Sequence, residues 1–293
     1  MSLLGEALAH GAVTIVNAIA TGKGSALSIG LWTKARVELV ENGDFQVEIV
    51  SDPNENPALA VKSVEAVLER FGLKGKFGAR IRTESNIPIA RGLKSSSVAA
   101  NAIVLAALAA LNRSLEPLEA VKLGVKAAIE AGVTITGAFD DASASYLGGI
   151  TVTDNLSQRL LRHEKAAEGL EAVILVPKVK SYTATSEVEK VKLMAPLVEI
   201  AFQQALKGEY WKAMTLNGLI YSAAYGYEVS PALEALKAGA LAAGLSGKGP
   251  ALAAITREEQ ADRVVEALQA FEGEILRAKV NNEQAKILRL GEA

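Results

Sequence analysis

The sequence predicts a protein of mixed strands and helices that divides into two parts. Residues 11–50 carry β-branched and alternating runs between the turn segments TGKGS and ENGD, which is typical of strands. Helical patterns follow over residues 95–111 and 118–131. The second half predicts a strand, helices, a strand, a helix and a final strand, and the polar stretch 154–168 marks the boundary between the halves.

The other elements follow one another with short connections. Asn42-Gly43 is a hairpin signal after the early strands. Helical periodicity runs from Pro57 to Phe71, and residues 76–84 alternate as a half-exposed strand does. The remaining predictions are strands at 170–177, 251–256 and 273–280, and helices at 190–206, 211–225, 231–243 and 258–271.

Composition excludes several classes of function. The net charge of −2 offers no basic excess for nucleic acid or an anionic membrane. The absence of cysteine excludes disulfides and thiolate metal sites, and two histidines argue against a histidine-rich zinc site. The apolar N-terminus has no basic region, and the longest apolar run, 98–111, is too short for a membrane span. We therefore expect a soluble, cytoplasmic protein, either monomer or homodimer.

The segment from Ser85 to Leu111 is the most informative part of the chain. Gly92 allows a tight turn or a close approach to a ligand, and Ser95, Ser96 and Ser97 are good N-cap residues for the helix that follows. A helix N-terminus binds anions, phosphate above all, and serine hydroxyls can ligate Mg²⁺. The alternative is an ordinary capped core helix.

Two further segments carry candidate chemistry. Asp140 and Asp141 are adjacent carboxylates among small residues, which suit a cation, a hydroxyl substrate or a catalytic base. Otherwise one of them caps the following short helix. Gly244 to Ala251 holds three glycines and Lys248, which can wrap a phosphate; the alternative is a flexible turn. P-loop and dinucleotide-binding motifs are absent.

These segments, in this order, resemble the GHMP kinase superfamily. Residues 88–99 are a nearly complete match to its P-x-x-x-G-L-x-S-S-x-A motif, and residues 244–251 are similar to its C-terminal glycine-rich motif. Within it, GLKSSS, TGAFDDASASYLGG and GLSGKGPA are most similar to the archaeal-type shikimate kinases. The resemblance covers almost the whole chain. It implies an α+β, two-domain GHMP kinase fold, divided at residues 1–160 and 161–293, with the active site in the cleft between the domains.

The resemblance also implies ATP and Mg²⁺ as cofactors and a role for each motif residue. Asp140 takes the place of the catalytic carboxylate, and its neighbour Asp141 is not distinguished from it. The mevalonate-kinase branch has an N-terminal lysine that assists the catalytic Asp; the matching position here is Ala12, so Lys23 is the candidate to compensate. Ser96 and Glu130 would bind the metal. The residues that would bind ATP are Pro88, Arg91, Gly92, Leu93, Lys94, Ser95, Ser96, Ser97, Ser246, Gly247, Lys248 and Gly249.

The implied activity is phosphorylation of the 3-hydroxyl of shikimate, in the chorismate pathway of aromatic amino-acid biosynthesis. Lys23, Arg36 or Arg91 would hold the substrate carboxylate, since cations bind carboxylates. Residues 178–186 are the candidate for a mobile loop beside the substrate. The alternatives are another small hydroxylated acceptor, homoserine or mevalonate, or a non-catalytic ATP-binding sensor.

Overall fold

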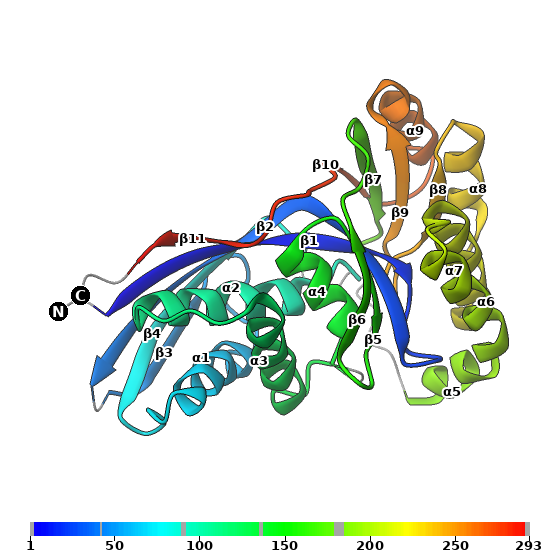
Figure 1. Ribbon diagram of the computed structural model, residues 1–293. Helices are drawn as coiled ribbons and strands as arrows, with labels where there is room; N and C mark the ends of the chain where they lie inside the picture. Colours follow the sequence, from blue (N-terminus) through cyan, green and yellow to red (C-terminus); the bar gives the residue numbers. More distant parts are fainter. Residues whose placement is uncertain (1–2, 42, 89–91, 135–136, 179–184, 291–293) are drawn as a thin grey trace.

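The computed structural model describes residues 3–41, 43–88, 92–134, 137–178 and 185–290. In this part of the chain two sheets form. The first has the order β11-β1-β2-β4-β3, with β5 paired to β2 and β6 to β5; the second has the order β10-β7-β9-β8 (Figure 1). The first sheet contains β1 (Leu4–Val16), β2 (Lys23–Glu41), β3 (Phe45–Ile49), β4 (Phe77–Ser85), β5 (Ile150–Asp154), β6 (Arg159–Glu164) and β11 (Lys286–Arg289). The second contains β7 (Leu170–Val176), β8 (Ala242–Leu245), β9 (Leu252–Arg257) and β10 (Glu274–Lys279).

Helices cover both sheets. α1 (Ala58–Arg70), α2 (Ser95–Ala110), α3 (Pro117–Glu130) and α4 (Phe139–Leu147) accompany the first sheet. α8 (Ser230–Lys237) and α9 (Ala261–Leu268) pack on the second. Between these groups lie α5 (Thr185–Leu193), α6 (Ala195–Leu206) and α7 (Tyr210–Tyr225), with η1 (Glu258–Gln260) preceding α9. Because α7 contacts both β8 and β1, it links the two sheets.

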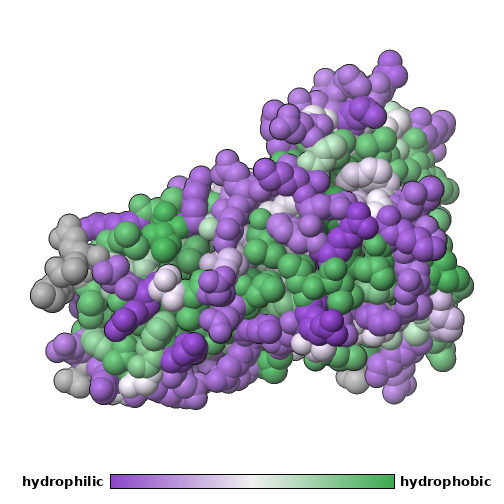
Figure 2. All heavy atoms as spheres, in the orientation of Figure 1, coloured by the Kyte–Doolittle hydropathy of each residue, from purple (hydrophilic) through white to green (hydrophobic). Residues whose placement is uncertain are grey.

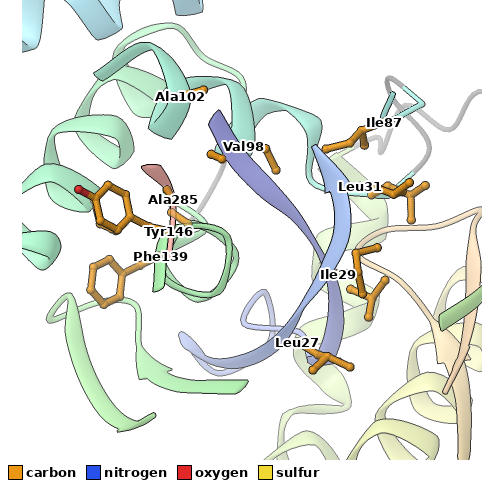
Figure 3. Close-up of a cluster of buried hydrophobic side chains, with 14 of the residues drawn as sticks. Leu27, Ile29, Leu31, Ile87, Val98, Ala102, Phe139, Tyr146 and Ala285 are labelled. Atoms are coloured by element: carbon orange, nitrogen blue, oxygen red, sulfur yellow. The ribbon is translucent and has the colours of Figure 1, made fainter. Parts of the chain in front are cut away.

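α2 forms the centre of the first core. It is buried on nearly every side, as expected for a helix built from Ala, Val, Ile and Leu. Gly5 lets the helix lie close to β1, because a Cβ there would meet the backbone of Ala106 and Ala110. Figure 3 shows the surrounding cluster, with labelled side chains from β2, α2 and α4: Leu27, Ile29, Leu31, Val98, Ala102, Phe139 and Tyr146. This packing fixes where α2 and α4 begin.

The C-terminal segment returns to the first sheet. After β10, the Asn281 amide donates to Ser28 Oγ at 3.0 Å, and Gly149 N donates to the carbonyl of Asn281 at 2.8 Å. β11 then pairs antiparallel with β1, with Glu6 opposite Arg289. β6 spans the predicted boundary at residue 160. β11 comes from the C-terminal half of the chain but belongs to the first sheet. The division at 160 stays a prediction.

Most helices and strands lie where the sequence predicts them, and two local predictions were wrong. Asn42-Gly43 does not join a hairpin, because β4 lies between β2 and β3 and pairs parallel with β3. The helix predicted over 231–243 ends at Lys237, and β8 follows. The stretch 154–168, where the boundary between the two parts was expected, contains β6, which extends the first sheet.

The surface carries both polar and apolar side chains. Figure 2 shows hydrophilic residues along the borders of this face and apolar ones between them. Apolar atoms normally form more than half of a folded protein's surface. Among the helices described, none has the length and apolar character needed to cross a bilayer.

Candidate active site

A cavity of about 550 Å³ opens where α2 and α4 begin. Its wall includes Lys94 and the first turn of α2, Asp140 and Asp141 of α4, and the loop 247–249. The cavity also reaches α1, and this part, called the arm toward α1, is lined by Glu55, Asn56, Leu59 and Ala60. The lining residues thus come from both halves of the chain, and two helix N-termini meet there.

The N-terminus of α2 is open toward the cavity. Lys94 occupies the N-cap in the left-handed conformation, with φ of 65°, and no side chain caps the helix. The expectation that a serine caps α2 was therefore wrong. Ser95, Ser96 and Ser97 form its first turn instead, and all three line the cavity. Unpaired N–H groups and hydroxyls together suit an anion such as phosphate.

Hydrogen bonds hold the two glycine-rich loops, one around Gly92 and the other at residues 244–251, in fixed positions. Ser246 is fully buried, and its hydroxyl donates to the carbonyl of Gly92 at 2.9 Å. Gly247 donates its N–H to Thr14 Oγ1 at 2.8 Å, and its carbonyl accepts from the Asn17 amide at 2.8 Å. Gly92 has φ of +84°, and a Cβ on it would meet the Ser246 carbonyl. Both loops are therefore held rigidly at the cavity, with Gly247, Lys248 and Gly249 on its wall.

Asp140 is buried and firmly oriented. Its Oδ1 accepts from the Asn155 amide at 2.8 Å, and its N–H donates to Asn155 Oδ1 at 3.2 Å. Thr153 Oγ1 donates to the same Asn155 oxygen at 2.7 Å, which fixes the amide. On the other side the carboxylate lies against Gly24, since a Cβ there would overlap Asp140 Oδ2. The arrangement holds a carboxylate at a fixed position on the cavity wall.

Asp141 is held by a different partner. Its Oδ2 lies 2.8 Å from Lys94 Nζ, and the two side chains are only 7% and 10% exposed. Burial, and next the nearby charge of Asp140, raise the pKa of Asp141 to about 7, although Lys94 acts in the opposite direction. Both carboxylates lie in the first turn of α4, where a helix favours negative charge, and neither caps it. The prediction that one of them is a cap was wrong.

Two predicted functional residues are absent from the cavity wall. Lys23 Nζ lies 3.2 Å from Glu199 Oε1 at the start of β2. Glu130 is 42% exposed and lies 3.8 Å from Lys126 Nζ, because α3 turns Ala128 rather than Glu130 toward the cavity. The arrangement gives neither residue a contact with the site, and their catalytic and metal-binding roles stay predictions.

Other predicted residues support the site from behind or lie elsewhere. Leu93 is buried in the core, Pro88 is half-buried, and Ser246 ties the loops together. Arg36 lies on β2 with its guanidinium 3.7 Å from Glu6. Arg91, and most of the predicted mobile loop 178–186, lie outside the described residues.

Sequence reasoning missed a group of polar residues that organise the site. Asn17 lines the cavity, and its N–H donates to Asn217 Oδ1 at 3.0 Å. The Tyr221 hydroxyl donates to the carbonyl of Asn17 at 3.0 Å. Together with Asn155, these residues come from separate segments. Asn17 is an isolated polar residue in the apolar stretch 12–20, and that is a signal that could have found it, because a buried polar residue needs a partner. Asn155 lies in the polar stretch 151–158, where nothing local distinguishes it.

Comparisons with known proteins agree with this geometry. The family model described as GHMP kinases N terminal domain matches residues 58–149, and GHMP kinases C terminal matches residues 208–273. A protein named shikimate kinase from Methanosarcina acetivorans is 47% identical, with 97% of each chain covered. One of the same name from Pyrococcus abyssi is 44% identical, covering 91% of this chain and 96% of its own.

Solved structures show the same fold at low identity. Homoserine kinase from Cytophaga hutchinsonii has a TM-score of 0.75 at 18% identity, with 98% of both chains covered. Mevalonate kinase from Methanococcus jannaschii has a TM-score of 0.74 at 17% identity, covering 96% of this chain and 98% of its own. The predicted α+β architecture of this superfamily is confirmed. The chain belongs to the GHMP kinases.

Proposed function

We propose that this protein is a shikimate kinase, which transfers the γ-phosphoryl group of ATP to the 3-hydroxyl of shikimate. The observation that carries the reaction type is the meeting, in one cavity, of the open α2 N-terminus and a buried, oriented carboxylate, Asp140. The choice of acceptor rests on the relatives, which are 42–47% identical over most of the chain and are named shikimate kinase.

The phosphates of ATP would lie against the first turn of α2. Backbone N–H groups of Ser95, Ser96 and Ser97 point along the helix toward the cavity, and the helix dipole adds positive potential. Lys94 and Lys248 add two cations on the same wall. Phosphoryl transfer depends mainly on such positioning and electrostatic stabilisation.

The arm toward α1 suits the nucleoside. Ile49, Leu59, Ala60 and Val133 give it apolar walls, and Asn56 adds a polar side chain that can recognise a base. Binding pockets for small molecules commonly combine apolar walls with a few polar groups. We therefore place the adenosine in this arm, which directs the γ-phosphate toward α4.

Asp140 would receive the hydroxyl proton. The acceptor oxygen forms a bond to the γ-phosphorus, the bond from that phosphorus to the β–γ bridging oxygen breaks, and ADP leaves with the electron pair. The proton of the hydroxyl passes to the Asp140 carboxylate, which Asn155 holds in place. No other proton acceptor is needed.

Magnesium fits this donor set as an ion carried by ATP. Mg²⁺ is commonly held by a few protein oxygens together with substrate phosphates, and the hydroxyl of Ser96 lines the phosphate end of the cavity. Among the described residues, no cluster of three or more acidic or histidine side chains could hold a metal alone. When bound, the ion would neutralise phosphate charge.

The experiment is a coupled assay of ADP release with MgATP and three acceptors: shikimate, homoserine and mevalonate. We expect turnover with shikimate alone, and a loss of about 100-fold or more in Asp140→Asn, as for a removed general base. Turnover with homoserine or mevalonate in place of shikimate would contradict the shikimate assignment and identify that compound as the acceptor. If the protein binds ATP but turns over none of the three acceptors, the result would favour the alternative of a non-catalytic ATP-binding sensor. Location in the cytoplasm and the monomer or homodimer state stay predictions.

A further inference from the structure

Lys94 occupies a backbone position that usually favours glycine. Its φ of 65° is in the left-handed region, where a side chain crowds the backbone. Gly92, two residues earlier, also has positive φ, and there the chain uses glycine, which relieves the strain. Strained residues cluster at functional sites, so the contacts of this lysine side chain are the next observation.

The ammonium of Lys94 lies where three parts of the site meet. It is 2.8 Å from Asp141 Oδ2 in the first turn of α4, and Lys94 itself begins α2. It also lies beside the second glycine-rich loop, 3.2 Å from where a Cβ on Gly247 would stand. Both members of the ion pair line the cavity. The charge is therefore placed beside the helix N-terminus that is open to an anion.

The two adjacent carboxylates have separate partners. Asp140 accepts from the Asn155 amide, whereas Asp141 faces the Lys94 ammonium. Asp141 Oδ1 is buried and has no hydrogen-bond partner, so among the described residues the polar contact of this carboxylate is the one from Oδ2 to Lys94. A buried ion pair adds little stability by itself, because desolvation offsets the attraction. This favours a role for the pair in the reaction.

We propose that Asp141 is a positioning residue that acts through Lys94: it holds the lysine ammonium where the transferred phosphoryl group gains charge. This inference rests on the proposed function. An ammonium has three N–H donors, and the contact with Asp141 uses one of them. A lysine side chain is flexible, so an anchored ammonium needs less reorganisation during the reaction. Asp140 then faces the acceptor hydroxyl, and the two carboxylates do different work.

The test is a double-mutant cycle with Lys94→Met, Asp141→Asn and the variant carrying both. We expect kcat to fall about 100-fold or more in Lys94→Met, as for other removed charge-stabilising donors. Asp141→Asn should lower kcat about 10-fold or more with little change in the KM for ATP, since the ammonium remains but is no longer anchored. The doubly substituted protein should match Lys94→Met alone, because Asp141 acts only through Lys94.

Additive losses would overturn the proposal, because Asp141 would then act independently of Lys94. Glu171→Gln is the matched control: it removes the carboxylate of another ion pair, 2.7 Å from Arg277, on the second sheet. It should keep kcat, and thermal unfolding checks that every variant folds.

A binding measurement separates this inference from the proposed function. We would measure affinity for ADP and for a non-hydrolysable ATP analogue, without acceptor. Lys94→Met should reduce the preference for the ATP analogue, and an unchanged preference would contradict contact between Lys94 and the γ-phosphate. If the wild-type protein uses a different acceptor, the shikimate assignment fails, and the cycle is measured with that acceptor. If the wild-type protein binds neither nucleotide, both proposals fail.

Discussion

At the residue scale, the position of Asp140 depends on a residue with no side chain. Gly24 on β2 leaves the space that the carboxylate occupies, since a Cβ there would lie 2.7 Å from Asp140 Cγ. Asn155 holds the other side of the carboxylate. The direction of the proposed base is thus set by one hydrogen-bond partner and one missing methyl group.

We expect Gly24→Ala to displace the carboxylate and lower kcat by about 100-fold, because misplacing a reacting group by about 1 Å has effects of that size. Steady-state kinetics with shikimate measures this loss, and nucleotide affinity should stay within about three-fold of wild type. Gly30→Ala, on the same strand, is the control: its Cβ would come no closer than 3.3 Å to a neighbour. Equal kcat in the two variants would contradict a fixed carboxylate.

The sequence identified the parts of the site that are contiguous. Gly92, residues 94–97, residues 247–249 and both aspartates lie on the cavity wall, and their roles there stay predictions. Asn155 could not be predicted, because it meets Asp140 only after β5 pairs with β2 and places it beside α4. The separate partners of Asp140 and Asp141 were hidden for the same reason. Tertiary contacts, rather than local pattern, distinguish the two carboxylates.

At the element scale, the close packing of α2 on β1 decides the architecture of the first half. Gly5 lies against the helix backbone, with Ala110 N at 2.5 Å and Ala109 Cβ at 2.8 Å from where a Cβ would stand. Neither the helix axis nor the central strand can move without disturbing the rest of the core. The small residue is therefore needed for the helix to begin at the cavity.

Gly5→Ala should destabilise the protein by about 3 kcal/mol, in the range of overpacked cores. Urea unfolding measures the free energy, with Gly30→Ala again as the control, for which we expect a loss of less than about 1 kcal/mol. Nearly equal values would show that α2 can shift away from β1.

Local patterns predicted helices better than strand partners. The sequence patterns of α1, α2, α3 and α7 are carried by contiguous residues, and these helices lie where they were expected. The turn at Asn42-Gly43 suggested a hairpin of β2 and β3. However, β4 lies between these two strands in the sheet, although it begins only at Phe77, well after β3 ends at Ile49. β8 was read as part of a helix because its AAGL sequence has no strong strand preference. Sheet order needs information from distant segments.

At the scale of the whole molecule, a short polar segment connects the two sheets. Asn281 donates to Ser28 Oγ and to the carbonyl of Glu283, and accepts from the Glu283 N–H. Asn282 exchanges two hydrogen bonds with the backbone of Ala166. These bonds fix the position of the segment that connects β10 of the second sheet with β11 of the first.

Asn281→Ala should lower the free energy of unfolding by about 2 kcal/mol, because it leaves buried partners without hydrogen bonds. Chemical denaturation measures the loss. Asn54→Ala is the comparison, since that exposed side chain lies in a loop, and it should change stability by less than about 0.5 kcal/mol. Equal effects would mean that the segment does not hold the sheets together.

The pairing of β11 with β1 also has a consequence during synthesis. Chains are made from the N-terminus at about 5–20 residues per second, and early segments begin to fold before later ones exist. β1 leaves the ribosome well before its neighbour β11, because residues 17–285 are made in between. One edge of β1 therefore waits unpaired for roughly 15–60 seconds at that rate. Throughout this interval the nascent protein exposes a strand edge that other chains can pair with, so newly made copies depend on being kept apart until β11 has been made.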